Sequence, residues 1–358
     1  MAKKIFKIVG IVLLAVIVLA AALLIWLTAT EYKPESKEDV SVTAAKDASA
    51  KTLSPGDSLS VLTWNVGYGG LGKGSEFFMD GGKGVRDADE DTVKSYVKGI
   101  YDTAYNGDGK ADIHMFQEVD KNSHRTYGID ETEPLSEGGS STFALNFSVN
   151  FIPYPIPPIG RVQSGLLTSS DYAVESAQRI ALPTPFKWPT RVANLKRCLL
   201  VNYIPLEGSD KYLVMVDLHL EAYDSGEGKI AQTKVLNEFI QSEYDKGNYV
   251  IAGGDFNQEF PGALVVYPNT HKDLWTPGTL DASMIPDGWS FAYDTSTPSC
   301  RLLNQAYNPD DKENTQYYVI DGFIVSPNVT VDSVKTLDEG FANSDHNPVL
   351  LKATLNTK

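Results

Sequence analysis

YVIAGGDFNQEF, residues 249–260, is an apolar run that ends in two glycines and then presents Asp255 and Asn257. Short runs rich in Val, Ile and aromatic residues are typical of buried strands. Positions i and i+2 of an extended chain share a face, so the two polar side chains can point at one ligand. The alternative is a Gly-Asp turn in which Asp255 and Asn257 only cap the backbone.

Two other strings place carboxylates after apolar runs, far away in the sequence. FQEVD at 116–120 contains Glu118, and SDHNP at 344–348 supplies Asp345 and His346. Asp321 lies in YVIDGFIV at 318–325, where a buried carboxylate is costly unless it is paired. Carboxylates that converge with histidine and asparagine are typical of hard-metal sites that hydrolyse phosphoesters.

Five of these residues suit proton transfer and phosphate contact. Asp255 can orient or deprotonate a water, and Asn257 can donate to a phosphoryl oxygen. Asp321 is the natural partner of His346, because a carboxylate holds an imidazole in one tautomer and raises its pKa. His219, late in the strand-like run VMVDLHLEAY, is a second proton donor or a phosphate contact.

Three residues suit a metal ion. Glu118 fits Mg²⁺, which usually takes one or two protein carboxylates and keeps several waters. Asp345 can face the same ion, and Asn65 in LTWNVG can orient Glu118 or contact phosphate. Each residue alone has an ordinary structural explanation, but so many polar groups at strand ends are hard to explain by chance.

The remaining pattern from residue 58 predicts an α/β fold. Apolar runs of strand length recur along the chain, and helical spacing is clear at 89–105 and 228–244. Many strands and few helices predict sheets packed on each other with helices outside.

The N-terminus predicts a membrane anchor. Residues 8–27 carry no charge and no proline. A helix of this length can cross a bilayer core of roughly 30 Å. Lys3, Lys4 and Lys7 precede this run, so the positive-inside bias puts the N-terminus in the cytoplasm and the body outside. The alternative is a cleaved signal peptide, although its apolar region is usually shorter. Residues 31–57 mix charge, Ala, Ser and Pro, which predicts a flexible stalk.

Charge and cysteine content bear on the class of protein. The formal net charge of −15 argues against a nuclease without excluding one, since binding of a nucleic acid backbone depends on Lys and Arg unless metal ions take part. The two cysteines, Cys198 and Cys300, form no C-x-x-C, which excludes a cysteine zinc site. The two cysteines can form a disulfide or can be two buried free thiols, and the sequence leaves both alternatives open.

These motifs occur in the order found in the endonuclease/exonuclease/phosphatase superfamily, and the chain resembles membrane-anchored bacterial members. The resemblance to the superfamily rests on WN at 64–65, QE at 117–118, His219, GDFN at 254–257, ID at 320–321 and SDH at 344–346. The likeness to membrane-anchored bacterial members rests on QEVD at 117–120, followed by Ser123 and Arg125, and on FFMDGG at 77–82. The resemblance to the superfamily covers about residues 58–356 and implies a four-layer α/β sandwich that hydrolyses phosphoesters with Mg²⁺, with Mn²⁺ as an alternative. It implies metal binding by Glu118, Asn65 and Asp345, and catalysis by Asp255, Asn257, His219, Asp321 and His346.

The predicted organisation is a cytoplasmic N-terminus and anchor at 1–30, a stalk at 31–57 and a catalytic domain at 58–358. The expected function is in-line hydrolysis of a phosphoester by water, outside the cell membrane. The substrate is a nucleic acid, a phospholipid headgroup or a sugar phosphate, and no obligate protein partner is evident. The alternatives are an inactive binding module and, among enzymes, a sphingomyelinase-like headgroup hydrolase.

Two further features concern substrate contacts. Five arginines can bind anions, and of these we expect only Arg301 to contact substrate, the others being solvated charges: Arg161, Arg179, Arg191, Arg197 and Arg301. The loop FIPYPIPPIG at 151–160 is apolar, and we expect it to pack on the body, with contact to lipid as the alternative.

Overall fold

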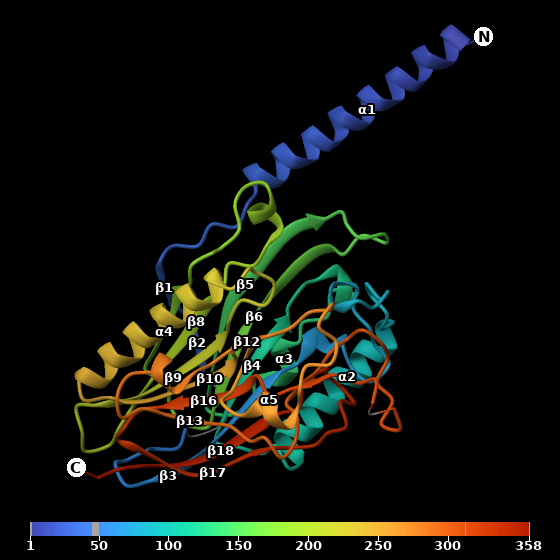
Figure 1. Cartoon of the computed structure of the whole chain (residues 1–358). Coiled ribbons are helices and arrows are strands. Elements are labelled where there is room, and N and C mark those ends of the chain that lie inside the picture. Colours follow the sequence, from blue (N-terminus) through green and yellow to red (C-terminus); the bar gives the residue numbers. More distant parts are fainter. Residues whose placement is uncertain (1, 45–49, 312, 358) are drawn as a thin grey trace.

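The computed structural model describes residues 2–44, 50–311 and 313–357, and two large sheets form its body (Figure 1). The first sheet has seven strands, in the spatial order β1 (Lys37–Val40), β7 (Ser176–Ala181), β8 (Cys198–Pro205), β9 (Tyr212–His219), β10 (Tyr249–Asp255), β16 (Asp321–Val325) and β13 (Ser290–Ala292). The second also has seven, in the order β17 (Val329–Thr336), β18 (Val349–Leu355), β3 (Ser58–Asn65), β4 (Ile113–Asp120), β6 (Gly160–Ser170), β5 (Ser140–Ile152) and β2 (Val42–Ala44).

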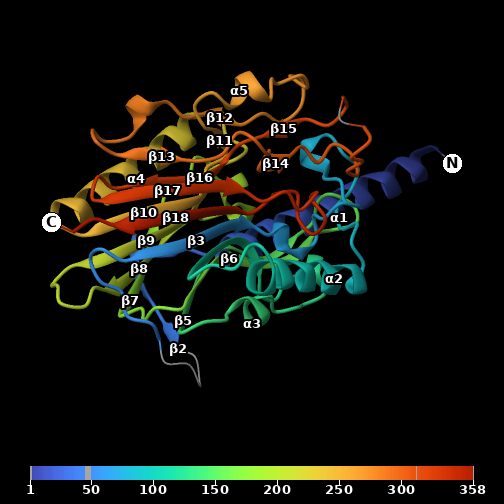
Figure 2. The same cartoon turned by 90° about the horizontal axis from the view of Figure 1, so that it is seen from below.

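Helices lie outside the two sheets, as Figure 2 shows. Helix α4 (Glu227–Asp245) covers the first sheet through Leu236 and Ile240. Helix α2 (Glu90–Tyr101) buries Val93, Val97 and Ile100, and the last packs with residues of β3 and β4 in the second sheet. The shorter helices are α3 (Thr132–Leu135) and α5 (Ala263–Val266), with a π-helical turn η3 (Asp102–Asn106) after α2. The smaller elements are the 3-10 turns η1 (Gly67–Gly69), η2 (Phe78–Asp80), η4 (His124–Thr126), η5 (Thr190–Ala193) and η6 (Ala282–Met284), and the strand pairs β11 (Gln258–Glu259) with β12 (Gly278–Thr279) and β14 (Cys300–Arg301) with β15 (Tyr317–Tyr318).

The main core lies between the sheets, where inward-facing residues such as Val61, Met115, Ile251 and Phe323 are fully buried. With α2 on one outer face and α4 on the other, the body is a four-layer α/β sandwich, so the predicted fold class is confirmed. The two predicted helical segments are also confirmed.

Parallel pairs at the centre of each sheet decide where the polar residues meet. β3 runs parallel to β4, and β9 runs parallel to β10. The carboxyl ends of parallel strands lie at one edge of a sheet, so the residues that follow the apolar runs gather there. The motifs of both sheets thereby come to a common edge.

The segment predicted as a flexible stalk is partly sheet. β1 pairs with β7 at the edge of the first sheet, and β2 pairs with β5 at the edge of the second. Leu53 is buried in the core between the sheets. These strands have only three or four residues and no sustained apolar period, so the backbone pairing left no signal in the sequence. The domain boundary at residue 58 stays a prediction.

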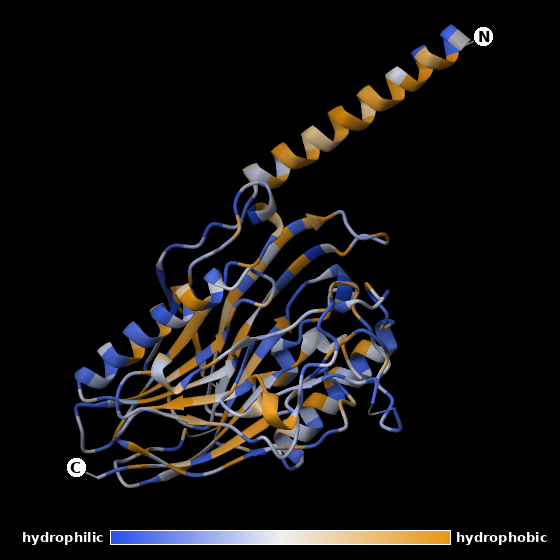
Figure 3. Ribbon diagram, in the orientation of Figure 1, coloured by the Kyte–Doolittle hydropathy of each residue, from blue (hydrophilic) through white to orange (hydrophobic). Residues whose placement is uncertain are grey.

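Helix α1 (Ala2–Ala29) extends from the body, and in Figure 3 most of its length has the hydrophobic colour, with hydrophilic residues near its N-terminal end. The helix segment Lys3–Ala29 is long and apolar enough to cross a membrane, and an 18-residue window within it has a mean hydropathy of 3.4. A signal sequence can have the same length and composition. Only its last turns contact the body, where Leu27 packs with Val149 and Val192.

Candidate active site

The strand register of the first sheet places three of the expected residues side by side. Asp255 ends β10 opposite His219 of β9 and opposite Asp321 of β16. The preceding glycine makes this spacing feasible: Gly254 has a φ of +148°, and a Cβ there would lie 1.9 Å from the carbonyl oxygen of Leu218. Only glycine tolerates that approach, so the GGD string brings the Asp255 carboxylate close to β9.

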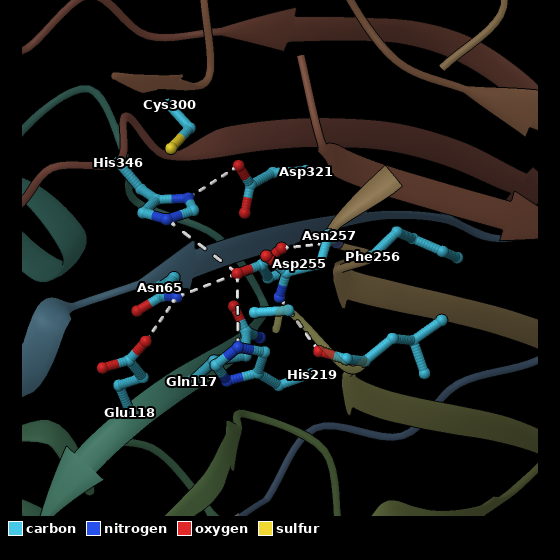
Figure 4. A network of polar contacts seen from close by, with 12 residues as sticks. Asn65, Gln117, Glu118, His219, Asp255, Phe256, Asn257, Cys300, Asp321 and His346 are labelled. Atoms are coloured by element: carbon cyan, nitrogen blue, oxygen red, sulfur yellow. Dashed lines mark hydrogen bonds and ion pairs between the residues drawn. The ribbon is translucent and has the colours of Figure 1, made fainter. Parts of the chain in front are cut away.

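Asp255 is the centre of the polar network in Figure 4. Its Oδ1 accepts from the backbone N–H of Asn257 (2.8 Å), and its Oδ2 accepts from the amide of Asn65 (3.0 Å). The same Oδ2 lies 3.4 Å from Nε2 of His219 and 3.9 Å from Nε2 of His346. Burial, together with the charge of Asp321, raises the pKa of Asp255 to about 7, which suits a general base at neutral pH.

His346 forms a buried pair with Asp321. Its Nδ1 lies 2.8 Å from Oδ2 of Asp321, and Ser299 donates to that same oxygen at 2.7 Å. Burial alone would lower the pKa of His346, but the Asp321 carboxylate outweighs it and holds the pKa well above its usual value. His346 is therefore a proton donor at neutral pH.

The strand end of β3 explains how the SDH string reaches this pair. Trp64 donates its indole N–H to the His346 carbonyl oxygen (2.8 Å), and Ser344 donates its hydroxyl to the Asn65 carbonyl oxygen (2.8 Å). The WN and SDH motifs are therefore one interlocked unit, although 279 residues separate Asn65 from Ser344.

His219 is the neutral histidine of the site. Burial lowers its pKa well below the usual value, and the nearby Arg197 guanidinium lowers it further. Its Nδ1 is buried and has no hydrogen-bond partner among the described residues. A neutral imidazole beside Asp255 can donate a hydrogen bond without carrying charge.

Glu118 comes from the second sheet at a distortion of β4. The pairing with β6 shifts register between Phe116 and Val119, and Glu118 has a φ of +56°. A bulge of this kind turns a side chain away from the regular alternation, and such strained backbone often accompanies functional sites. The Glu118 carboxylate lines the same cavity as Asp255.

Asn65 links the carboxylates of the two sheets. Its amide nitrogen donates to Glu118 (3.1 Å) and to Asp255 (3.0 Å), while its side-chain oxygen accepts from the N–H of Gly67 (3.0 Å). This geometry suits a residue that positions Glu118 and Asp255, and the metal role of Asn65 stays a prediction.

Three carboxylates face the cavity on the side of Glu118. Asp345 and Asp80 are both buried, and burial with the nearby charge of Glu118 raises the pKa of each to about 6. Asp80 accepts from the hydroxyl of Tyr223 (3.0 Å). Asp80 was not predicted, and its signal was the FFMDGG string in which it follows three apolar residues.

Other donor atoms also gather closely enough for a metal ion. Asp255, Asp321 and His346 offer ligand atoms within 4.8 Å of one another, as do Cys300, Asp345 and His346. Cys300 and Cys198 are both free and buried.

Three of the five arginines differ from the prediction in burial and hydrogen bonding. Arg301 is buried, and its guanidinium donates to the carbonyl oxygens of Leu302, Gln305, Gly72 and Ser75. These bonds hold two loops together. Of the guanidinium nitrogens of Arg301, only Nε lacks a partner among the described residues. Arg179 and Arg197 are also buried, which corrects their assignment as solvated charges. The substrate role of Arg301 stays a prediction.

Arg125 is a cavity residue that the sequence did not single out as a site residue. It makes two 2.9 Å hydrogen bonds to Asp120, and its guanidinium lies 3.5 Å from the ring centroid of Tyr68. Asn257, predicted to contact phosphate, lines the same cavity and donates one amide hydrogen to the Leu220 carbonyl oxygen (2.9 Å). Its second amide hydrogen is available to a ligand.

Most of the predicted site residues surround one cavity of about 480 Å³, which lies within the usual size of small-molecule sites. Of the nine predicted site residues, Asn65 and Asp321 are the two that do not line it, because they hold the lining groups from behind.

Three solved structures of similar fold carry the same family description. An endonuclease/exonuclease/phosphatase from Beutenbergia cavernae matches with a TM-score of 0.51 and 18% identity, over 84% of this chain and 72% of that chain. A family protein from Bacteroides thetaiotaomicron matches with a TM-score of 0.51 and 15% identity, over 85% of this chain and 100% of that chain. One from Bacteroides vulgatus has a TM-score of 0.50 at 15% identity, over 84% and 100%. No protein-family profile and no curated protein matches the sequence. The predicted resemblance is therefore confirmed at the level of the fold.

Proposed function

We propose that this chain, which has the fold of the endonuclease/exonuclease/phosphatase proteins, is a divalent-metal-dependent phosphoester hydrolase held at a membrane by α1. The observation that carries the proposal is the convergence of both sheets on one cavity. Glu118 arrives from the second sheet, His219 and Asp255 arrive from the first, and Asp345 and His346 arrive on the loop before β18.

The donor set fits a hard cation. Glu118, Asp345 and Asp80 line one cavity, and burial, together with the nearby charge of Glu118, raises the pKa of the other two carboxylates. Oxygen donors of this kind suit Mg²⁺, or Mn²⁺ in its place. We assign Glu118 and Asp345 as ligands, with Asp80 as a further carboxylate of the same site. The bound cation would offset negative charge on the phosphoryl oxygens.

The chain's own groups supply the proton transfers. Asp255 takes a proton from water as the new P–O bond forms, and the P–O bond to the leaving alcohol breaks on the opposite side. Protonated His346 gives its proton to the leaving oxygen. Asp255 then returns a proton to His346 across their 3.9 Å contact, which restores both groups. His219 and Asn257 donate hydrogen bonds to the phosphoryl oxygens.

The test uses the full chain in lipid nanodiscs with bis(p-nitrophenyl) phosphate and Mg²⁺. We expect turnover that a chelator abolishes and that Glu118→Gln or His346→Ala lowers by at least about 100-fold. Glu133→Gln, a change at an exposed glutamate outside the cavity, serves as the matched control and should keep full activity. Absence of turnover on this ester and on DNA, phospholipids and sugar phosphates would instead support the inactive binding module.

We also propose that α1 stays attached and holds the domain outside the cell membrane. The support is the apolar length of the helix, the three lysines before it and the packing of its last turns on the body.

A further inference from the structure

The cavity that holds the catalytic groups is mostly walled by apolar side chains. They come from η2, from the β5–β6 hairpin and from the segment at 186–195, and include Phe78, Met79, Phe147, Ile152, Tyr154 and Phe186. A phosphate group alone needs none of them, so the wall must contact another part of the substrate. Apolar walls with a few convergent polar groups are typical of sites for molecules with an apolar body.

The same wall continues to the end of the apolar helix. Phe147, Ile152 and Ala193 line the cavity, and they also belong to the cluster that packs against the last turns of α1 around Leu27. In Figure 1 the β5–β6 hairpin tip and the C-terminal end of α1 lie on the same side of the body. The catalytic cavity is therefore connected by apolar side chains to the place where α1 leaves the body.

Exposed apolar residues surround this side. Tyr154 is 70% exposed and Ile156 is 81% exposed in the loop at 151–160, which differs from the predicted packing of that loop. Trp188 is 56% exposed, and its indole donates to the hydroxyl of Thr28 near the end of α1. Aromatic and aliphatic side chains in such a position are typical of proteins that lie in the membrane interface.

Charge argues against a polyanion as the occupant. Among the described residues that line the cavity the arginines are Arg125, Arg197 and Arg301, and there is no lysine. Each guanidinium already donates to a carboxylate or to backbone carbonyl oxygens. A nucleic acid strand needs several free cations along its backbone, and a chain of net charge −15 offers no such track here.

We infer that the substrate is a membrane lipid phosphoester, whose phosphoryl group reaches the catalytic residues while its apolar chain lies along the wall between the cavity and α1. This inference rests on the proposed function and names its substrate class. Hydrolysis then leaves the apolar product at the bilayer surface and releases the polar product to water.

The first experiment measures kcat/KM of the full chain in nanodiscs on p-nitrophenyl alkyl phosphodiesters, from methyl to octyl. We expect kcat/KM to rise by up to about fourfold per methylene buried. Met79→Ser and Tyr154→Ser should flatten this rise, because both residues line the cavity yet are exposed enough that folding is not at risk. Val265→Ser is the matched control, being an exposed apolar residue of α5 on a face away from α1, and it should keep the wild-type slope.

The second experiment embeds hexadecyl p-nitrophenyl phosphate in phosphatidylcholine vesicles that also carry the full chain. Two results together support delivery of the substrate from the bilayer. The wild type should cleave the embedded ester, and Ile156→Glu should slow this cleavage more than it slows cleavage of the soluble methyl ester. A flat wild-type series, or a rising series without cleavage of the embedded ester, overturns the lipid inference and leaves the proposed hydrolase intact. Absence of turnover on every ester, the methyl ester included, overturns both.

Discussion

At the scale of single residues, Asp321 acts from behind the cavity on the pKa of His346 and, through its charge, on the pKa of Asp255. It does not line the cavity, and its Oδ2 contacts His346 and Ser299. We expect Asp321→Asn to lower kcat by about 100-fold or more, with little change in KM. Asp321 raises the pKa of His346, which must be protonated to act, so activity is lost as pH rises through that pKa. The substitution should therefore move this alkaline limb to lower pH.

Ser299→Ala is the matched control for that experiment. It removes the hydroxyl that donates to the Asp321 carboxylate and accepts from the backbone N–H groups of Ile320 and Asp321, but it keeps the negative charge of Asp321. We therefore expect a smaller loss of kcat and an alkaline limb close to wild type. If Asp321→Asn lowers kcat while the limb stays in place, Asp321 has only a structural role.

Asp255 should determine the acid limb of the profile of kcat/KM against pH. Its pKa is raised from 3.8 to about 7, and it must be deprotonated to accept a proton, so kcat/KM should increase as pH rises through neutrality. The hydrogen bond from Asn65 favours the charged carboxylate and lowers this pKa. Asn65→Ala should therefore shift the acid limb to higher pH in a kcat/KM profile. An unmoved limb would assign it to another group.

The sequence predicted the site residues that lie in recognisable strings. It did not reveal the residues whose role depends on tertiary contacts. Asp255 and Glu118 each follow an apolar run, and His346 shortly precedes one, so their strings were visible. Ser299 has no pattern of its own, because its role arises only when its loop meets Asp321. The amide orientation of Asn65 was equally invisible, since the N–H of Gly67 fixes it after folding.

At the scale of the elements, His114 joins β4 to the π-helical turn η3. Its Nε2 donates to the carbonyl oxygen of Ala104 (2.9 Å), and burial lowers its pKa from 6.5 to about 4. The unfolded chain takes up a proton as pH falls below 6.5, while the folded chain does not until about pH 4. We therefore expect the free energy of unfolding to fall by about 3 kcal/mol over that window, a loss absent at higher pH.

Equilibrium unfolding of wild type and His114→Gln checks this. Glutamine can still donate to Ala104 and does not titrate, so the advantage of wild type over the variant should shrink by about that amount from neutral to acidic pH. A constant difference would show that His114 titrates normally in the folded chain.

Leu53 tests the segment that was predicted to be a stalk. It is 1% exposed and packs in the core between the sheets. Truncating a buried leucine typically costs about 2–5 kcal/mol, so Leu53→Ala should lower the free energy of unfolding by that order. A flexible stalk would give no loss. Val265→Ala, at an exposed apolar position, is the control and should change stability little.

The layers of the fold were predictable because their elements carry periodic patterns. β10 is a buried apolar run, and α2 repeats Val93, Val97 and Ile100 on one face. β1 and β2 were not predictable, since edge strands of this length bind through backbone groups that any sequence possesses.

At the scale of the whole molecule, helix α1 packs on the body through its last turns, which bears on whether α1 is removed. Residues 19–22, LAAA, offer small side chains for cleavage, but Leu23, Leu24 and Leu27 just beyond them pack on β5 and η5. The end of α1 is thus part of the body's apolar surface, and we expect the chain to keep it. Intact mass of the membrane-extracted protein should be close to 39.1 kDa, and a carbonate wash should not release it.

The charge at the N-terminus predicts the orientation of α1 in the membrane. Lys3, Lys4 and Lys7 should hold the N-terminus inside, so protease added to spheroplasts of a bacterial host should digest the body while a tag before Lys3 survives. Replacing the three lysines by glutamate should reduce the digested fraction, because the bias in positive charge is then lost. A body that resists protease in the wild type would place the cavity on the cytoplasmic side, where the same apolar wall would face the inner leaflet.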